Sequence, residues 1–211
     1  MDDAVKRPYN SRRRAEKAQE NRERIIRAAT ELFVRHGYGQ TTIAEVAEAA
    51  GASAETVYKA FGNKAALLRS AWHTMFRGDE RNVPLYDRPE MQAILGIADL
   101  GARIEAHARF VTANNRRSAP LLRVIEGAAG GDDGARAMLA EWKDRLADVA
   151  ARYARSAEET GQLVFPAAEC ADVVYATMDG ALWQRLVAER GWDDERFAGW
   201  LAEQWRRQFL G

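Results

Sequence analysis

Residues 41–64 read TTIAEVAEAAGASAETVYKAFGNK, and this stretch predicts two short helices joined by a tight turn. Thr42 precedes Glu45 by three positions, which is the capping-box spacing that opens a helix. Gly51 can adopt the positive φ at which such a helix ends, and Ser53 is a good N-cap for the next one. Two short helices joined by a glycine-containing turn form the helix-turn-helix pattern, whose second helix enters the major groove of DNA.

The same stretch resembles the DNA-binding domain of the TetR family of bacterial transcriptional regulators, whose usual wording is close to T-T-x-x-x-I-A-x-x-A-G-V-S-x-G-T-x-Y-x-Y-F-x-S-K-x-x-L. The chain shares with that wording Thr41, Thr42, Val46, Ala47, Ala50, Gly51, Ser53, Thr56, Tyr58, Phe61, Lys64 and Leu67. Departures that concern the choice of DNA sequence more than the fold occur at Ala54, Glu55, Lys59 and Ala60.

The hydrophobic pattern predicts an all-α protein, because helical periodicity runs through the chain without strand-like alternation. We expect a flexible basic arm over residues 1–14, a three-helix DNA-binding domain over 15–62, and a helical domain over 63–211. Within the last domain the pattern predicts helices over residues 90–97, 99–114, 119–129, 132–159 and 166–190, and a final helix that ends near Leu210. The resemblance implies that this domain binds a ligand and forms the dimer.

Composition excludes some classes of protein and leaves others open. The chain has 31 basic and 31 acidic residues, so net charge alone favours no partner. Residues 1–70 carry 13 basic and 9 acidic side chains, which is the sign expected of a part that meets phosphates. No signal peptide or membrane span is evident, so we expect a cytoplasmic protein. The single cysteine, Cys170, excludes an intramolecular disulfide and is expected to be a small buried side chain.

The candidate DNA-binding residues lie on the predicted helix-turn-helix and just before it. They are Arg13, Arg14, Thr41, Thr42, Ser53, Ala54, Glu55, Thr56, Tyr58, Lys59 and Lys64. The resemblance implies backbone contacts from Thr42, Ser53, Thr56, Tyr58 and Lys64, and base reading near Ala54, Glu55 and Lys59. The arginines before the first helix fit either minor-groove contacts or a solvated charge run. Glu55 either accepts a hydrogen bond from cytosine or turns away from DNA, because phosphates repel a carboxylate.

Two further groups of residues follow from the apolar pattern of the second domain. The last two helices are apolar over wide arcs, which indicates an interface between two copies; its candidates are Tyr175, Met178, Leu182, Trp183, Trp200, Leu201 and Trp205. Large apolar side chains with a few polar groups suit a ligand pocket, although most of them are expected to be plain core. The pocket candidates are Trp72, Met75, Phe76, His107, Phe110, Asn114, Leu121, Glu126, Met138, Trp142 and Met178.

These patterns favour a TetR-like regulator that acts as a repressor. We expect it to bind double-stranded DNA at a palindromic operator as a homodimer, and to be released from that DNA by a small lipophilic ligand. No cofactor and no metal site are expected, because the histidines lack ligand partners at a suitable spacing. An enzyme is not expected either, since the phosphate-loop, GxSxG and HExxH motifs are absent. Two alternatives remain: a DNA-binding protein of the same fold that is constitutive or controlled by a partner, and a helical enzyme or carrier.

Overall fold

The structure is a computed structural model that describes residues 6–77, 83 and 85–211. These described residues are mostly helical and contain no strand, which confirms the all-α class. They divide into two compact units, and the boundary along the chain falls between Thr74 and Met75. The sequence predicted this boundary after Gly62. None of the helices in the described ranges is both long enough and apolar enough to cross a membrane.

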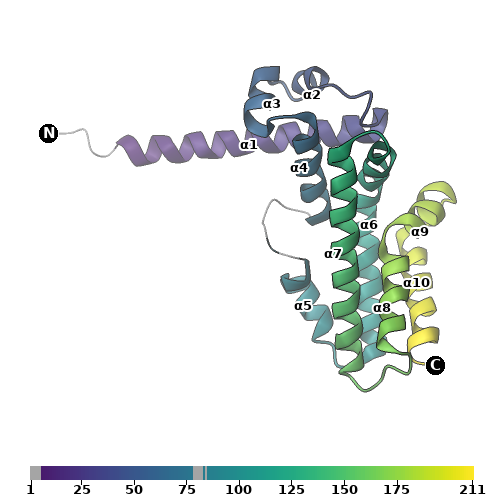
Figure 1. Ribbon diagram of the computed structural model, residues 1–211. Coiled ribbons are helices and arrows are strands. Elements are labelled where there is room, and N and C mark those ends of the chain that lie inside the picture. Colours follow the sequence, from purple (N-terminus) through teal and green to yellow (C-terminus); the bar gives the residue numbers. More distant parts are fainter. Residues whose placement is uncertain (1–5, 78–82, 84) are drawn as a thin grey trace. The chain divides into compact units, whose positions relative to one another are not determined.

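The first unit contains α1 (Lys6–His36), α2 (Ile43–Ala49), α3 (Ala54–Phe61) and the part of α4 (Lys64–Arg77) that runs to Thr74. α2 packs against α1 and α3 (Figure 1). Apolar side chains at helical spacing form the core, because each helix places one face toward its neighbours. The largest of them are Ile25, Ile26, Phe33, Ile43, Val46, Val57, Phe61, Leu67, Leu68 and Trp72.

α1 is longer than the sequence predicted. The helix begins at Lys6, whereas residues 1–14 were predicted to be a flexible arm. Residues 13–20 are all exposed, and the buried face starts only at Ile25. The charged residues of this segment favour the helical state by their own propensity, which hydrophobic periodicity does not detect. Residues 1–5 of the predicted arm lie outside the described residues.

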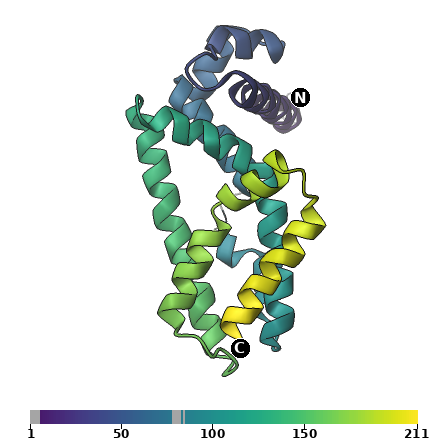
Figure 2. The same ribbon diagram turned by 90° about the vertical axis from the view of Figure 1, so that its right-hand side faces the viewer.

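The second unit is a helical bundle in which α6 (Leu100–Ala129) packs against α7 (Asp133–Glu158) and α10 (Asp194–Phe209). α8 (Ala167–Met178) packs along α7 (Figures 1 and 2). Short elements complete the unit: the 3-10 turn η1 (Leu85–Asp87), α5 (Pro89–Leu95), α9 (Ala181–Trp183) and the π-helix η2 (Gln184–Glu189). Asp132 caps α7 through a 2.8 Å hydrogen bond from the Ala135 N–H, and the predicted helix over residues 132–159 is confirmed.

Two predicted helix boundaries were wrong, and both errors concern residues whose neighbours are distant in sequence. α6 is continuous where two helices were predicted, with Pro120 inside it. Ala119 and Leu121 are both buried beside that proline, so tertiary packing outweighs the lost backbone hydrogen bond. Conversely, the predicted 166–190 helix is interrupted at Gly180, where φ is +94°. A Cβ at this position would lie 3.2 Å from the Ala119 side chain. This contact is tight, so any residue larger than glycine would be strained here.

Candidate functional site

The start of α2 is held by the predicted capping box. Thr42 Oγ1 accepts from the Glu45 N–H at 3.2 Å, and the Thr42 N–H donates to Glu45 Oε2 at 2.8 Å. These hydrogen bonds, first from the Thr42 backbone and then from its hydroxyl, lower the pKa of Glu45. The box satisfies backbone groups at the helix start and so fixes where α2 begins.

The turn and the start of α3 also follow the sequence prediction. Gly51 has φ +59°, which only glycine adopts readily. Ser53 Oγ accepts from the Thr56 N–H at 3.1 Å and lies 2.8 Å from Thr56 Oγ1. Val57 and Phe61 are buried beneath the helix. The paired hydroxyls of Ser53 and Thr56 therefore lie at the N-terminal end of α3, which we call the recognition helix.

The outward face of the recognition helix carries the other predicted contact residues. Tyr58 is 53% exposed, an unusual value for a large aromatic side chain in this chain. Glu55 and Lys59 are exposed, and Ala54 is half-buried. Within the described residues, the Glu55 carboxylate forms no hydrogen bond or ion pair, so it is open to an outside donor. This face combines hydroxyl, phenol, ammonium and carboxylate groups, which suit phosphate oxygens and base edges.

Thr41 does not belong to this exposed face, and its predicted side-chain contact with DNA is corrected. It is fully buried, and its hydroxyl lies within donating distance of two carbonyl oxygens, Gly37 at 2.9 Å and Leu32 at 3.2 Å. Lys64 is half-buried, and its Nζ donates to the carbonyl oxygens of Tyr38 at 2.9 Å and Thr41 at 3.1 Å. Both side chains stabilise the connection between α1 and α2.

Arg22 is a residue that the sequence analysis missed. Its guanidinium donates to the carbonyl oxygen of Ala60 at 3.1 Å and to Ser70 Oγ at 3.2 Å, and lies 4.3 Å from the Phe61 ring centroid. Arg22 thus joins α1 to the last turn of the recognition helix and to α4. The available signal was its position three residues before Ile25, on the stripe that becomes the buried face of α1.

In the second unit, three predicted pocket residues line one cavity of about 490 Å³: Phe76, Trp142 and Met178. The Phe76 and Trp142 rings meet edge to face, with centroids 4.5 Å apart and planes inclined by 70°. The remaining lining comes from η1 and α7, namely Leu85, Tyr86, Asp87, Asp144, Arg145, Leu146, Asp148, Val149 and Arg152. The volume and aromatic walls fit a drug-sized molecule.

Other predicted pocket residues lie elsewhere. Those that are buried in the second unit without lining this cavity are His107, Asn114, Leu121 and Met138. Half-buried Phe110 has its ring 6.5 Å from that of His107. Trp72 belongs to the first unit, and Met75 is half-buried beside Phe76 in the chain. Glu126 lines a shallow depression with Asp179, and partial burial together with that carboxylate raises its pKa.

His107 is the most unusual of these core residues. Its ring stacks on Tyr153 with centroids 4.2 Å apart and lies 5.3 Å from Trp205. Neither imidazole nitrogen has a hydrogen-bond partner among the described residues, and the Tyr153 hydroxyl has none either. Burial lowers the pKa of His107 to about 3 and raises that of Tyr153. The imidazole is therefore neutral at physiological pH.

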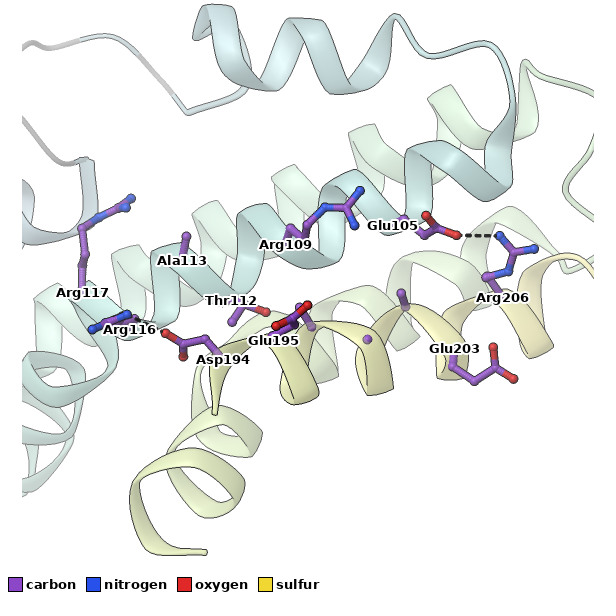
Figure 3. Close-up of a pocket in the computed structure, with 13 residues that line it drawn as sticks. Glu105, Arg109, Thr112, Ala113, Arg116, Arg117, Asp194, Glu195, Glu203 and Arg206 are labelled. Atoms are coloured by element: carbon purple, nitrogen blue, oxygen red, sulfur yellow. Dashed lines mark hydrogen bonds and ion pairs between the residues drawn. The ribbon is translucent and has the colours of Figure 1, made fainter. Parts of the chain in front are cut away.

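A larger hollow of about 770 Å³ lies between α6 and α10, and none of the predicted pocket residues lines it. Figure 3 shows two ion pairs across it, from Arg206 to Glu105 at 3.2 Å and from Arg116 to Asp194 at 2.9 Å. Small residues lie between these pairs, among them Ala113, Ala198, Gly199 and Ala202. The groove is thus charged at its rim rather than apolar.

The predicted interface residues divide between core and surface. Those buried within their own chain are Met178, Trp183, Leu201 and Trp205. Two of these buried side chains have hydrogen-bond partners within the chain. Trp205 Nε1 donates to Thr177 Oγ1, and Trp183 Nε1 donates to Asp194 Oδ1, each at 2.9 Å. Tyr175, Leu182 and Trp200 remain half-exposed. Sequence analysis missed half-exposed Trp192, whose ring centroid lies 6.1 Å from that of Trp200.

Comparison with known proteins agrees with this geometry. Residues 25–71, from the buried half of α1 into α4, match the family model described as "Bacterial regulatory proteins, tetR family". Over these residues the chain resembles the TetR family. Among curated relatives, the HTH-type transcriptional regulator TtgR of Pseudomonas putida is 44% identical over 59 residues, which are 28% of each chain. The HTH-type transcriptional repressor ComR of Escherichia coli is 42% identical over 50 residues, 24% of each.

The chain spans little more than a quarter of the length of the curated relatives that it matches. A solved structure extends the likeness in fold. NalD, described as the secondary repressor of the MexAB-OprM multidrug efflux pump in Pseudomonas aeruginosa, superposes with a TM-score of 0.67 over 92% of this chain and 97% of its own. At 19% identity this likeness concerns the fold.

Proposed function

We propose that the protein is a DNA-binding transcriptional regulator that acts as a repressor. The observation that carries the proposal is the exposed face of the recognition helix, with Tyr58 and Lys59 held outward over buried Val57 and Phe61. Ser53 and Thr56 place hydroxyls and backbone N–H groups at the start of that helix, where phosphate oxygens bind favourably. The match of residues 25–71 to the TetR family supports this assignment.

Within this proposal the residues of the face have separate roles. Thr42, Ser53, Thr56 and Tyr58 contact phosphates, and Ala54, Glu55 and Lys59 read bases. Glu55 accepts from the N4 amino group of a cytosine, because a carboxylate that lacks an internal partner needs a donor beside DNA. Lys64 contributes mainly through the loop that it holds. Exposed Arg13 and Arg14 on the N-terminal turns of α1 add favourable charge near the backbone.

The functional form is a homodimer that binds a palindromic operator. One recognition helix contacts too few base pairs for a specific site, whereas a twofold dimer presents two of them. Half-exposed Tyr175, Leu182 and Trp200, together with Trp192, provide apolar surface on α8–α10 for the second copy. Aromatic side chains of this kind are enriched in protein interfaces.

Control comes from a small lipophilic ligand bound in the cavity of the second unit. Phe76 lies on α4, the helix whose earlier residues belong to the DNA-binding unit, and its ring forms one wall of that cavity. A ligand that displaces this ring favours a different position of α4 and, in the dimer, a different spacing of the recognition helices. The state that spans both half-sites is then depopulated.

Selection of binding sites from random DNA tests the proposal. We expect enrichment of a palindrome whose half-sites are one helical turn or a multiple apart. Tyr58→Phe should weaken binding to every sequence by about fivefold, because it removes one hydrogen bond to phosphate. Lys59→Ala should change the preferred sequence instead. Equal binding to the selected palindrome and to random DNA across salt concentrations would contradict specific regulation.

A further inference from the structure

The 490 Å³ cavity has a wall structure that favours flat or aromatic molecules. Phe76 and Trp142 meet edge to face, and Tyr86 contributes a third ring from η1. The Tyr86 hydroxyl donates to the carbonyl oxygen of Arg152 at 3.3 Å, which holds this ring against α7. Aromatic faces carry negative potential and attract cations as well as other rings.

The positive side chains of the cavity are already compensated. Arg152 pairs with Asp148, with Nε 2.9 Å from Oδ2, and its guanidinium lies 5.2 Å from the Tyr86 ring centroid. Arg145 pairs with Glu141 one turn earlier on α7. An anionic ligand would have to compete with these carboxylates for the arginines. The cavity therefore offers no uncompensated positive group among its described lining residues.

Two negative side chains of the lining are in the opposite situation. Asp87 on η1 and Asp144 on α7 are both exposed, and neither forms an ion pair or a hydrogen bond within the part of the chain that is described. They come from different elements of the lining. The cavity consequently combines three aromatic rings with two uncompensated carboxylates.

We propose that this cavity binds a hydrophobic organic cation, with its apolar body against Phe76 and Trp142 and its charge balanced by Asp87 and Asp144. The inference rests on the proposed function in that it names the chemical class of the regulator's ligand. Binding itself requires no DNA, so the two can be tested separately. A positive charge on an apolar body gains both ring contacts and Coulomb attraction, whereas a neutral molecule gains only the former.

Isothermal titration of the full chain with tetraphenylphosphonium and with tetraphenylborate tests the proposal, because the two ions share their shape and differ in charge. We expect the cation to bind at least about tenfold more tightly than the anion, since even water-screened charges near contact differ by about 1 kcal/mol each. Asp144→Asn and Asp87→Asn should each weaken cation binding roughly fivefold. Circular dichroism checks that each variant melts like the parent protein.

Asp172→Asn is the matched control, because it removes the same charge from an exposed residue of α8 outside the cavity lining. It should leave cation binding within about twofold of the parent value. Three outcomes would overturn the proposal. They are no binding of the cation, binding of the borate that is equal or tighter, and equal losses of cation affinity in Asp144→Asn and Asp172→Asn. Selection of DNA sites with the same preparations separates this proposal from the proposed function. A preference for a palindrome without cation binding would overturn only the proposed ligand class. Cation binding without that preference would overturn only the proposed role as a transcriptional regulator.

Discussion

The guanidinium of Arg22 donates to the carbonyl oxygen of Ala60, at 3.1 Å, across 38 residues of sequence. This carbonyl lies in the last turn of the recognition helix, where backbone acceptors have no partner within the helix. The same guanidinium covers the Phe61 ring at 4.3 Å. Arg22 therefore fixes the C-terminal end of α3, while Ser53 fixes its N-terminal end.

Loss of this anchor should weaken the first unit. We expect Arg22→Ala to lower the free energy of unfolding by about 1–2 kcal/mol, because a charge-assisted hydrogen bond and a cation–ring contact disappear. Urea denaturation followed by circular dichroism measures the change. Arg27→Ala removes the same charge from an exposed position of α1 and should change stability by less than about 0.5 kcal/mol. Equal effects of the two variants would show that charge, rather than the anchor, matters.

The capping box should make the first unit sensitive to acid. Because its hydrogen bonds lower the pKa of Glu45 in the folded state below the ordinary 4.5, stability is greatest above that value and is lost as pH falls through the folded-state pKa. Glu45→Gln keeps an acceptor for the Thr42 N–H but cannot titrate. Denaturation between about pH 6 and about pH 3 should show a shallower loss for this variant than for the parent. Parallel curves would exclude a contribution from Glu45.

His107 should produce a second, independent acid dependence in the other unit. Burial lowers its pKa from 6.5 to about 3, so between these values the unfolded chain binds a proton that the folded chain does not. Stability should therefore fall as pH drops below about 6.5, by up to about 1.4 kcal/mol per pH unit from this residue. Denaturation curves collected at several pH values measure the slope.

Substitution of that histidine by an apolar ring tests the same point. His107→Phe should remove this slope and raise stability near neutral pH by about 1 kcal/mol, because two buried nitrogens without described partners disappear. Exposed His36→Gln is the control and should leave the slope in place. A loss of stability in His107→Phe at neutral pH would mean that the imidazole has a polar partner, such as a water or a ligand atom.

Two glycines should respond oppositely to the addition of a methyl group. Gly180 has φ +94° and a Cβ there would approach Ala119 at 3.2 Å, so Gly180→Ala should lower the unfolding free energy by about 1–3 kcal/mol. Gly127 lies within α6 with open space around its Cα. Gly127→Ala should raise stability by about 0.5–1 kcal/mol through helix propensity. Thermal melts of both variants compare the signs directly.

The sequence predicted the local features of the first unit because they depend on residues a few positions apart. The capping box of Thr42 and Glu45, the positive φ of Gly51 and the Ser53 cap are all of this kind. Arg22 was missed and Thr41 was misjudged for the opposite reason. The Ala60 partner of Arg22 lies 38 residues away, and the Leu32 and Gly37 partners of Thr41 lie 9 and 4 residues before it, outside the motif.

In the second unit, helical periodicity identified which residues are apolar but not which of them meet. Phe76, Trp142 and Met178 line one cavity, while Leu121 and Met138 fill the core, although all five look alike in sequence. The same limit explains Leu201 and Trp205, which were expected at the interface and face their own chain. A wide apolar arc on a helix indicates that two sides of the helix are buried. It does not identify which element covers either side.

Asp194 accepts from Trp183 Nε1 and pairs with Arg116, so one carboxylate joins α9, α6 and α10. A second ion pair, between Arg206 and Glu105, closes the other end of the same helix pair. Relative sliding of α6 and α10 would have to break both. Any ligand-driven rearrangement inside the second unit should therefore leave these two helices as a rigid frame and be absorbed on the opposite side, where η1 and α7 surround the aromatic cavity.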